Sequence, residues 1–187
     1  DQDLQSAGVM HEGELATRLG LTGIPVAAET AIIDRDIRLV ELTGARYHIH
    51  QISSSESVEA VRKAKARSLA VSCGVSTAHL MLNENDVENY RTFAKLNPPL
   101  RSEDDRLALV DGLADGTIDI VVSGHNPQDA EAKRQPFAQA AYGSVGVETL
   151  LSVLLSLHHA HGLDLATLIR AVTSHPARLL DIDGGTL

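Results

Sequence analysis

The chain has 187 residues, a formal net charge of −9 at pH 7 and a sequence pI near 5.4. Its lysines and arginines form no basic stripe, so a polyanionic partner such as nucleic acid is disfavoured. The longest apolar stretch, Val145 to Leu157, is interrupted by Gly146 and Glu148 and is too short to cross a bilayer of about 30 Å. The single cysteine, Cys73, cannot form an internal disulfide, so we expect a cytoplasmic protein.

The first part of the chain predicts a loop followed by a helix. Residues 8–23 are glycine-rich and lack a sustained period, which is typical of a loop at the mouth of a site. Residues 29–43 are expected to be helical and to end at Gly44. The apolar positions at helical spacing in this segment are Ile33, Ile37 and Val40.

Three apolar runs predict buried strands. They cover residues 46–53, 69–76 and 118–122. The serines at 53–55 predict the start of a helix over residues 56–67, between the first two strands.

A second capped helix is expected before the third strand. Ser102 is its predicted cap, and Gly116 is expected to stop it. Its inward-facing residues are predicted to be Leu107, Val110 and Leu113.

The C-terminal part predicts further helices. The Val147–Leu157 segment is apolar on nearly all sides, which predicts a fully buried helix. Pro176 suits the first turn of the last helix. The residues expected to form one apolar face of the intervening helix are Leu165, Leu168, Ile169 and Val172.

The alternation of strands and helices predicts a parallel α/β half-barrel. A complete barrel of eight strand–helix units typically needs about 250 residues, so we expect residues 1–187 to be part of one barrel domain. Active sites of such barrels lie where the strands end.

Histidines follow the predicted strand ends. Their positions are His48, His50, His79 and His125. Imidazoles grouped in this way are typical of a zinc site, since zinc prefers nitrogen and carboxylate ligands. The alternative is that they are hydrogen-bonded histidines at a barrel rim.

Three segments closely resemble the dihydroorotases, a branch of the amidohydrolase superfamily. The segments are Lys95 to Arg101, which contains Asn-Pro-Pro-Leu-Arg, Gly116 to Asp119, and Gly143 to Thr149. The resemblance implies a (β/α)8 TIM barrel of the metal-dependent amidohydrolase type, with only the C-terminal half to two-thirds in this chain. It also leads us to expect that the chain is truncated at both ends.

The resemblance further implies that essential site residues are replaced. In that family the third strand ends in Thr-Asp-His-Ala-Pro-His, whose Asp binds zinc and shuttles the proton, whereas this chain has Gly124 in place of the Asp. Gln51 stands where a zinc-binding His is found at the first strand end. The resemblance therefore places Gln51 in the lumen, and strand alternation then predicts that His48 and His50 face the opposite side.

Two further positions carry over from the resemblance. His79 matches a family His and is expected to be the single vestigial metal ligand, although a lone His at such a place is more often structural. Asn97 resembles a substrate-contacting position, although its two following prolines also suit a rigid loop.

These replacements predict a pseudo-dihydroorotase with no catalytic residue and no bound zinc. The resemblance then implies a scaffolding role in pyrimidine biosynthesis, as a partner of aspartate transcarbamoylase in a homo- or hetero-oligomer. The alternatives are an active zinc-dependent dihydroorotase that interconverts carbamoyl aspartate and dihydroorotate, a drifted amidohydrolase with ligands from outside this chain, and a ligand-binding barrel that has lost its chemistry.

Overall fold

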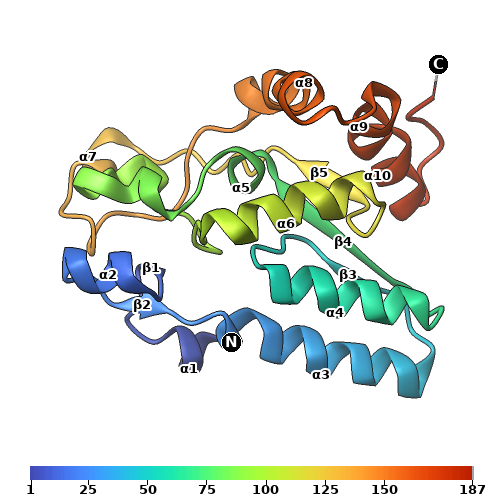
Figure 1. Cartoon of the computed structure of the whole chain (residues 1–187), viewed down its shortest axis with the longest axis horizontal. Helices are drawn as coiled ribbons and strands as arrows, with labels where there is room; N and C mark the ends of the chain where they lie inside the picture. Colours follow the sequence, from blue (N-terminus) through green and yellow to red (C-terminus); the bar gives the residue numbers. More distant parts are fainter. Residues whose placement is uncertain (187) are drawn as a thin grey trace.

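A three-stranded parallel sheet in the order β3-β4-β5 forms the centre of the molecule (Figure 1). The strands are β3 (Tyr47–Ile49), β4 (Val71–Ser76) and β5 (Ile120–Val122). The computed structural model describes residues 1–186. The predicted order of strands and helices is confirmed, although β3 is shorter than expected and ends at Ile49.

Three helices lie side by side and cover one side of this sheet (Figure 1). They are α3 (Ala27–Thr43), α4 (Ser55–Ala66) and α6 (Glu103–Ala114). Their buried side chains form the main core with residues of the strands. The predicted inward residues of α3 are confirmed, because Ile33, Ile37 and Val40 are all buried.

Local hydrogen bonds define the ends of these helices as the sequence predicts. The hydroxyl of Ser54 accepts a hydrogen bond from the backbone N–H of Ser57 at the start of α4. Ser102 accepts one from the N–H of Asp105 at the start of α6. Gly44 closes α3 with a left-handed φ of 70°.

The prediction that Leu107 faces inward from α6 is wrong. This side chain is 38% exposed, whereas Leu109 is buried together with Val110 and Leu113. At about 100° per residue, positions 109, 110 and 113 lie within about 100° of one another, and position 107 lies about 60° outside this face.

The expected loop over residues 8–23 is also wrong, because it contains regular structure. The chain begins with α1 (Gln2–Gln5), followed by β1 (Met10–His11), α2 (Glu14–Leu19) and β2 (Gly23–Ile24). β1 and β2 pair in parallel, and their neighbours form a second hydrophobic cluster. Two-residue strands have no detectable period, so only their long-range partners define them.

Short helices connect β4 to α6 and follow β5. They are α5 (Thr77–Met81), the 3₁₀ helices η1 (Glu84–Tyr90) and η2 (Thr92–Ala94), and α7 (Ala130–Lys133).

The C-terminal helices are less buried than the sequence suggests. They are η3 (Val147–Thr149), α8 (Leu150–His161), α9 (Leu165–Val172) and α10 (Ser174–Leu179). Leu151 is 62% exposed and Ile169 is 46% exposed, whereas Leu154 and Leu168 are buried. The prediction of a fully buried helix is therefore wrong, because each helix packs only one side onto the core. Within residues 1–186 no helix combines the length and the hydropathy that a membrane crossing requires.

Candidate functional site

The carboxyl ends of all three strands open into one cavity of about 470 Å³. This is where parallel α/β barrels keep their active sites. The lining residues contribute amides, hydroxyls and imidazoles but no carboxylate; they are His50, Gln51, Ser76, Ala78, His79, Leu96, Asn97, Val122, Ser123, Gly124, His125, Asn126, Tyr142, Gly143 and Ser144. The structure thus brings together Gln51, His79, Asn97 and Gly124, the four positions that the resemblance indicates.

Gln51 and His50 both border the cavity, which corrects the expectation that they face opposite sides. That expectation assumed strand alternation up to Gln51. Because β3 already ends at Ile49, the pleat no longer fixes the directions of the two following side chains. His48, which remains within the strand, does lie on the face opposite Ile49 and lines a different cavity.

His79 is held by hydrogen bonds on both ring nitrogens. Its Nε2 lies 3.0 Å from the carbonyl oxygen of Pro98, an acceptor only, so Nε2 carries the proton. Its Nδ1 therefore accepts from the hydroxyl of Ser76 at 2.7 Å. Burial lowers the pKa of His79, which favours this neutral form. The imidazole has no nitrogen left for a metal ion unless one of these bonds breaks.

Gly124 lies directly after β5 with a left-handed φ of 61°. A Cβ at this position would lie 3.0 Å from Cβ of Ser76 and 3.8 Å from Nε2 of Gln51. The space that a side chain would occupy is therefore already narrow, and the serine that limits it is the one that holds His79.

The segment after Gly124 is fixed by backbone contacts. The backbone N–H groups of Gly146 and Val147 donate to Nδ1 of His125 at 3.2 and 3.3 Å. The N–H of Asn126 donates to the carbonyl of Ser144 at 2.9 Å. A Cβ on Gly143 would lie 2.5 Å from the Asn126 side chain, so the two loops approach as closely as glycine permits.

Two buried lysines secure the wall on the Asn97 side. Nζ of Lys95 donates to the carbonyl of Ala138 at 3.0 Å, and Nζ of Lys133 donates to the carbonyls of Thr92 and Ala141 at 2.9 and 2.8 Å. Burial lowers the pKa of both lysines. They fasten the segment after β5 to the segment that leads into Asn97.

A second polar network lies behind the cavity. Arg101 is only 3% exposed and contacts residues from three distant parts of the chain, and Glu29 accepts hydrogen bonds from Ser53 and Ser57. Sequence reasoning did not identify this network. The serine run after β3 and the arginine that ends the Pro-Pro-Leu-Arg segment are its only sequence signals.

These residues do not fit the zinc ion that the fold class implies. Gln51 offers a neutral amide, Gly124 offers no side chain, and both nitrogens of His79 are engaged. Within residues 1–186, no group of three or more His, Cys, Asp or Glu side chains is arranged to hold a metal ion.

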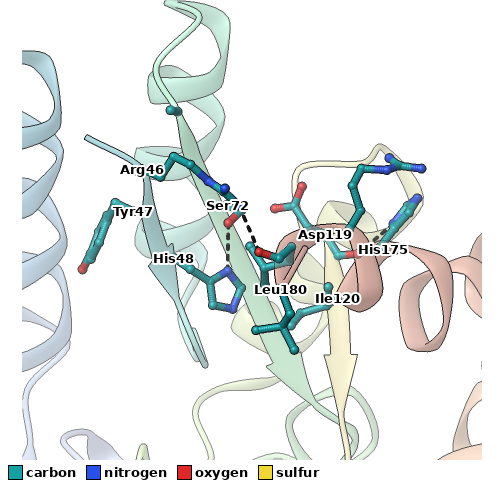
Figure 2. A pocket seen from close by; sticks show the side chains of 11 residues that line it. Arg46, Tyr47, His48, Ser72, Asp119, Ile120, His175 and Leu180 are labelled. Atoms are coloured by element: carbon teal, nitrogen blue, oxygen red, sulfur yellow. Dashed lines mark hydrogen bonds between the residues drawn. The ribbon is translucent and has the colours of Figure 1, made fainter. Parts of the chain in front are cut away.

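Another cavity, of about 500 Å³, lies beside the opposite ends of the strands (Figure 2). His48 borders it, with Nδ1 2.8 Å from the hydroxyl of Ser72 and with a buried Nε2 that has no hydrogen-bond partner among residues 1–186. His175 from α10 donates from Nδ1 to the carbonyl of Asp119 at 2.9 Å.

Asp119 precedes β5, far from Gly124, and its carboxylate accepts from Lys65 and from the N–H of Cys73. It therefore cannot act at the position of Gly124.

Solved structures define the class of this fold. An L-hydantoinase (dihydropyrimidinase) from Arthrobacter aurescens superposes with a TM-score of 0.82 at 28% identity, over 88% of this chain and 38% of that chain. A dihydropyrimidinase from Brevibacillus agri gives a TM-score of 0.81 at 21% identity, over 87% and 38% of the two chains. The chain thus has the α/β fold of part of these hydantoinase and dihydropyrimidinase chains, which confirms the predicted fold class.

Sequence comparison narrows the class. The model of the dihydro-orotase-like family matches residues 1–57. A dihydroorotase from Anaplasma phagocytophilum is 42% identical over all of this chain and 42% of its own length. One from Anaeromyxobacter dehalogenans is 48% identical over all of this chain and 44% of its own length. The chain is thus similar in sequence to dihydroorotases along its whole length, and it spans less than half the length of these relatives.

Proposed function

We propose that this protein is a non-catalytic homologue of the dihydroorotases that acts in the cytoplasm as a structural partner of aspartate transcarbamoylase in pyrimidine biosynthesis. The observation that carries the first part is Gly124. By the resemblance, the acid that binds zinc and moves the proton belongs at this position, and the structure has a glycine there whose side-chain space is limited by Ser76.

The rest of the cavity supports a loss of chemistry. General acid–base catalysis contributes about 10² to 10⁴ in rate, and a metal-bound water needs ligands to hold the metal. The cavity lining contains no carboxylate, and His79 uses both ring nitrogens in hydrogen bonds within the protein. His125 and His50 remain as the imidazoles at its rim, without a metal site beside them.

The partnership follows from the resemblance and from a fold that is retained where its chemistry is not. A stable complex is expected to bury about 1,200 to 2,000 Å² of surface. Exposed apolar side chains on α8 and α9, such as Leu151 and Ile169, are available for such a contact.

An active zinc-dependent dihydroorotase is the second candidate. Identity of 42% to 48% over the whole chain to proteins named dihydroorotase favours it. In that case the metal ligands and the proton acceptor would have to come from outside residues 1–186.

Zinc content and turnover separate these candidates. We expect protein purified without chelator to retain no stoichiometric zinc after dialysis. We also expect it to form or hydrolyse dihydroorotate no faster than the rate in buffer without the protein. About one zinc per chain, or turnover near 1 per second, would establish the enzyme instead.

Co-expression with the aspartate transcarbamoylase of the same cell tests the partnership. Size-exclusion chromatography with light scattering is expected to show one complex, and transcarbamoylase assembly is expected to fall when this protein is absent. Separate elution at micromolar concentration, with transcarbamoylase activity independent of this protein, would exclude the structural role.

A further inference from the structure

We propose that Arg101 is a positioning residue that joins the two walls of the cavity carrying Gln51 and Asn97, and that protonation of His11 loosens this link. This inference concerns the shape of the cavity and does not depend on the non-catalytic function proposed above.

Arg101 connects segments that are distant in sequence. Its Nε donates to the hydroxyl of Ser53 at 3.2 Å, and its Nη1 donates to the carbonyl of Ile24 at 2.7 Å. Ser53 follows Gln51 by two residues, and Arg101 itself follows Asn97 by four. One buried guanidinium therefore holds the loop after β3, the Asn-Pro-Pro-Leu-Arg segment and β2 in a fixed relation. A smaller cavity of about 200 Å³ also borders Gln51, Asn97 and Arg101 together.

The charge of Arg101 is balanced through Ser53. The Glu29 carboxylate accepts hydrogen bonds from the N–H of Ser53 at 2.9 Å and from its hydroxyl at 2.5 Å. The serine hydroxyl thus donates to Glu29 and accepts from Arg101. Burial lowers the pKa of Arg101, and Glu29 opposes that effect. Ser53 is therefore the residue through which the guanidinium contacts the segment that carries Gln51.

His11 supplies the remaining acceptor. Nη1 of Arg101 lies 3.1 Å from Nδ1 of His11. An arginine can only donate, so Nδ1 must be unprotonated and the imidazole neutral. A proton on Nδ1 would remove the acceptor and place a second positive charge against the guanidinium.

The surroundings of His11 favour the neutral form. Burial lowers its pKa, Arg101 lowers it further, and Asp105 on α6 and the adjacent Glu12 raise it. Glu84 borders the same glycine, Gly13, as the His11 ring, and burial raises the pKa of Glu84. Acidification is therefore expected to protonate His11, to break its bond with Arg101 and to loosen the link between the two cavity walls.

The test follows the side-chain amide signals of Gln51 and Asn97 by NMR from about pH 8 to about pH 5, with the ring signal of His11 recorded in the same samples. We expect part of the pH-dependent chemical-shift change of both amides to have the same midpoint as the titration of the His11 ring. His11→Gln keeps an acceptor for Arg101 but does not titrate, so this shared part should disappear. His50, His79 and His125 also border the cavity, and His50→Gln is the control that should retain it.

Arg101→Lys keeps the charge but loses the planar fork, and we expect it to displace both amide signals at neutral pH. The core amide of Leu113 should stay unchanged across the range in every variant, which separates a local change from unfolding. Should the lysine variant not fold, the comparison of the wild type with His11→Gln decides alone. Amide signals that ignore the His11 midpoint, or that follow the same curve in His11→Gln, would overturn the proposal.

Discussion

The hydroxyl of Ser76 lies 2.7 Å from Nδ1 of His79, and the same serine limits the space beside Gly124, where an added Cβ would lie 3.0 Å from its own Cβ. One small side chain thus links the histidine that the family resemblance indicates to Gly124, the position at which the resemblance places an acid. A side chain introduced at position 124 would therefore contact Ser76 and, through its hydrogen bond, would also affect His79.

This relationship predicts a larger loss of stability for Gly124→Ala than for Gly44→Ala. Both glycines have left-handed φ values, 61° and 70°, but Gly44 has no atoms within 4 Å of an added Cβ. Gly44→Ala should cost about 1 to 2 kcal/mol from the backbone alone. Gly124→Ala should lose about 1 to 3 kcal/mol more, because Ser76 must move. Urea denaturation of both variants measures the difference, and equal midpoints would mean that Ser76 yields freely.

Restoring the acid alone is not expected to restore activity. In Gly124→Asp the new carboxylate would still face Gln51 and an engaged His79, so no metal site is completed. We expect neither dihydroorotate turnover nor zinc retention in this variant. Adding Gln51→His supplies an imidazole ligand beside the new carboxylate. Zinc retention by this double variant is compared with that of Gly124→Asp alone. Turnover by the single variant would show that a metal site already exists and lacks only the acid.

Stability should fall on mild acidification because of buried histidines. Burial lowers the pKa of His79 in the folded state below its unfolded value of about 6.5. Its contribution is therefore complete above about pH 6.5 and is lost as the pH falls through the folded-state pKa. The slope attributable to one such group reaches about 1.4 kcal/mol per pH unit.

Urea titrations at several values between about pH 7 and pH 5 test this slope. His79→Gln should be less stable at pH 7 but should depend less on pH. His159→Gln, at an exposed position on α8, should keep the wild-type slope. An unchanged slope in His79→Gln would show that His79 does not titrate differently on unfolding.

Leu109 and Leu107 on α6 form a matched pair for mutation, because the first is buried and the second is exposed. Leu109→Ala removes a side chain that is 1% exposed and should cost about 2 to 5 kcal/mol. Leu107→Ala changes a side chain that is 38% exposed and should cost less than about 1 kcal/mol. Thermal denaturation of the two variants compares them, and a reversed order would mean that the helix is rotated from the position described.

Local signals account for the parts of the fold that were predicted correctly. Ser54 and Ser102 cap their helices, Gly44 ends another, and the apolar period of α3 selects its buried face. Each depends on residues within one or two helical turns. The strand–helix order and the fold class follow from such signals together with the family resemblance.

The same reasoning failed where burial depends on what packs nearby. An apolar residue on α8 has the same sequence signal whether it faces the core, as Leu154 does, or solvent, as Leu151 does. Strand alternation could not place His50 and Gln51, because the point at which β3 ends depends on its pairing with β4.

The sequence alone therefore determined which chemical groups are present at the strand ends, including the glycine at 124 and the glutamine at 51. Only the tertiary structure decided what those groups can do. The acceptor for Nε2 of His79 comes from Pro98, and Arg101 finds its acceptors on Ile24, Ser53 and His11. These contacts join residues between 19 and 90 positions apart. Folding creates them because a buried polar group without a partner costs about 1 to 3 kcal/mol, and no local sequence pattern specifies which partner will be within reach.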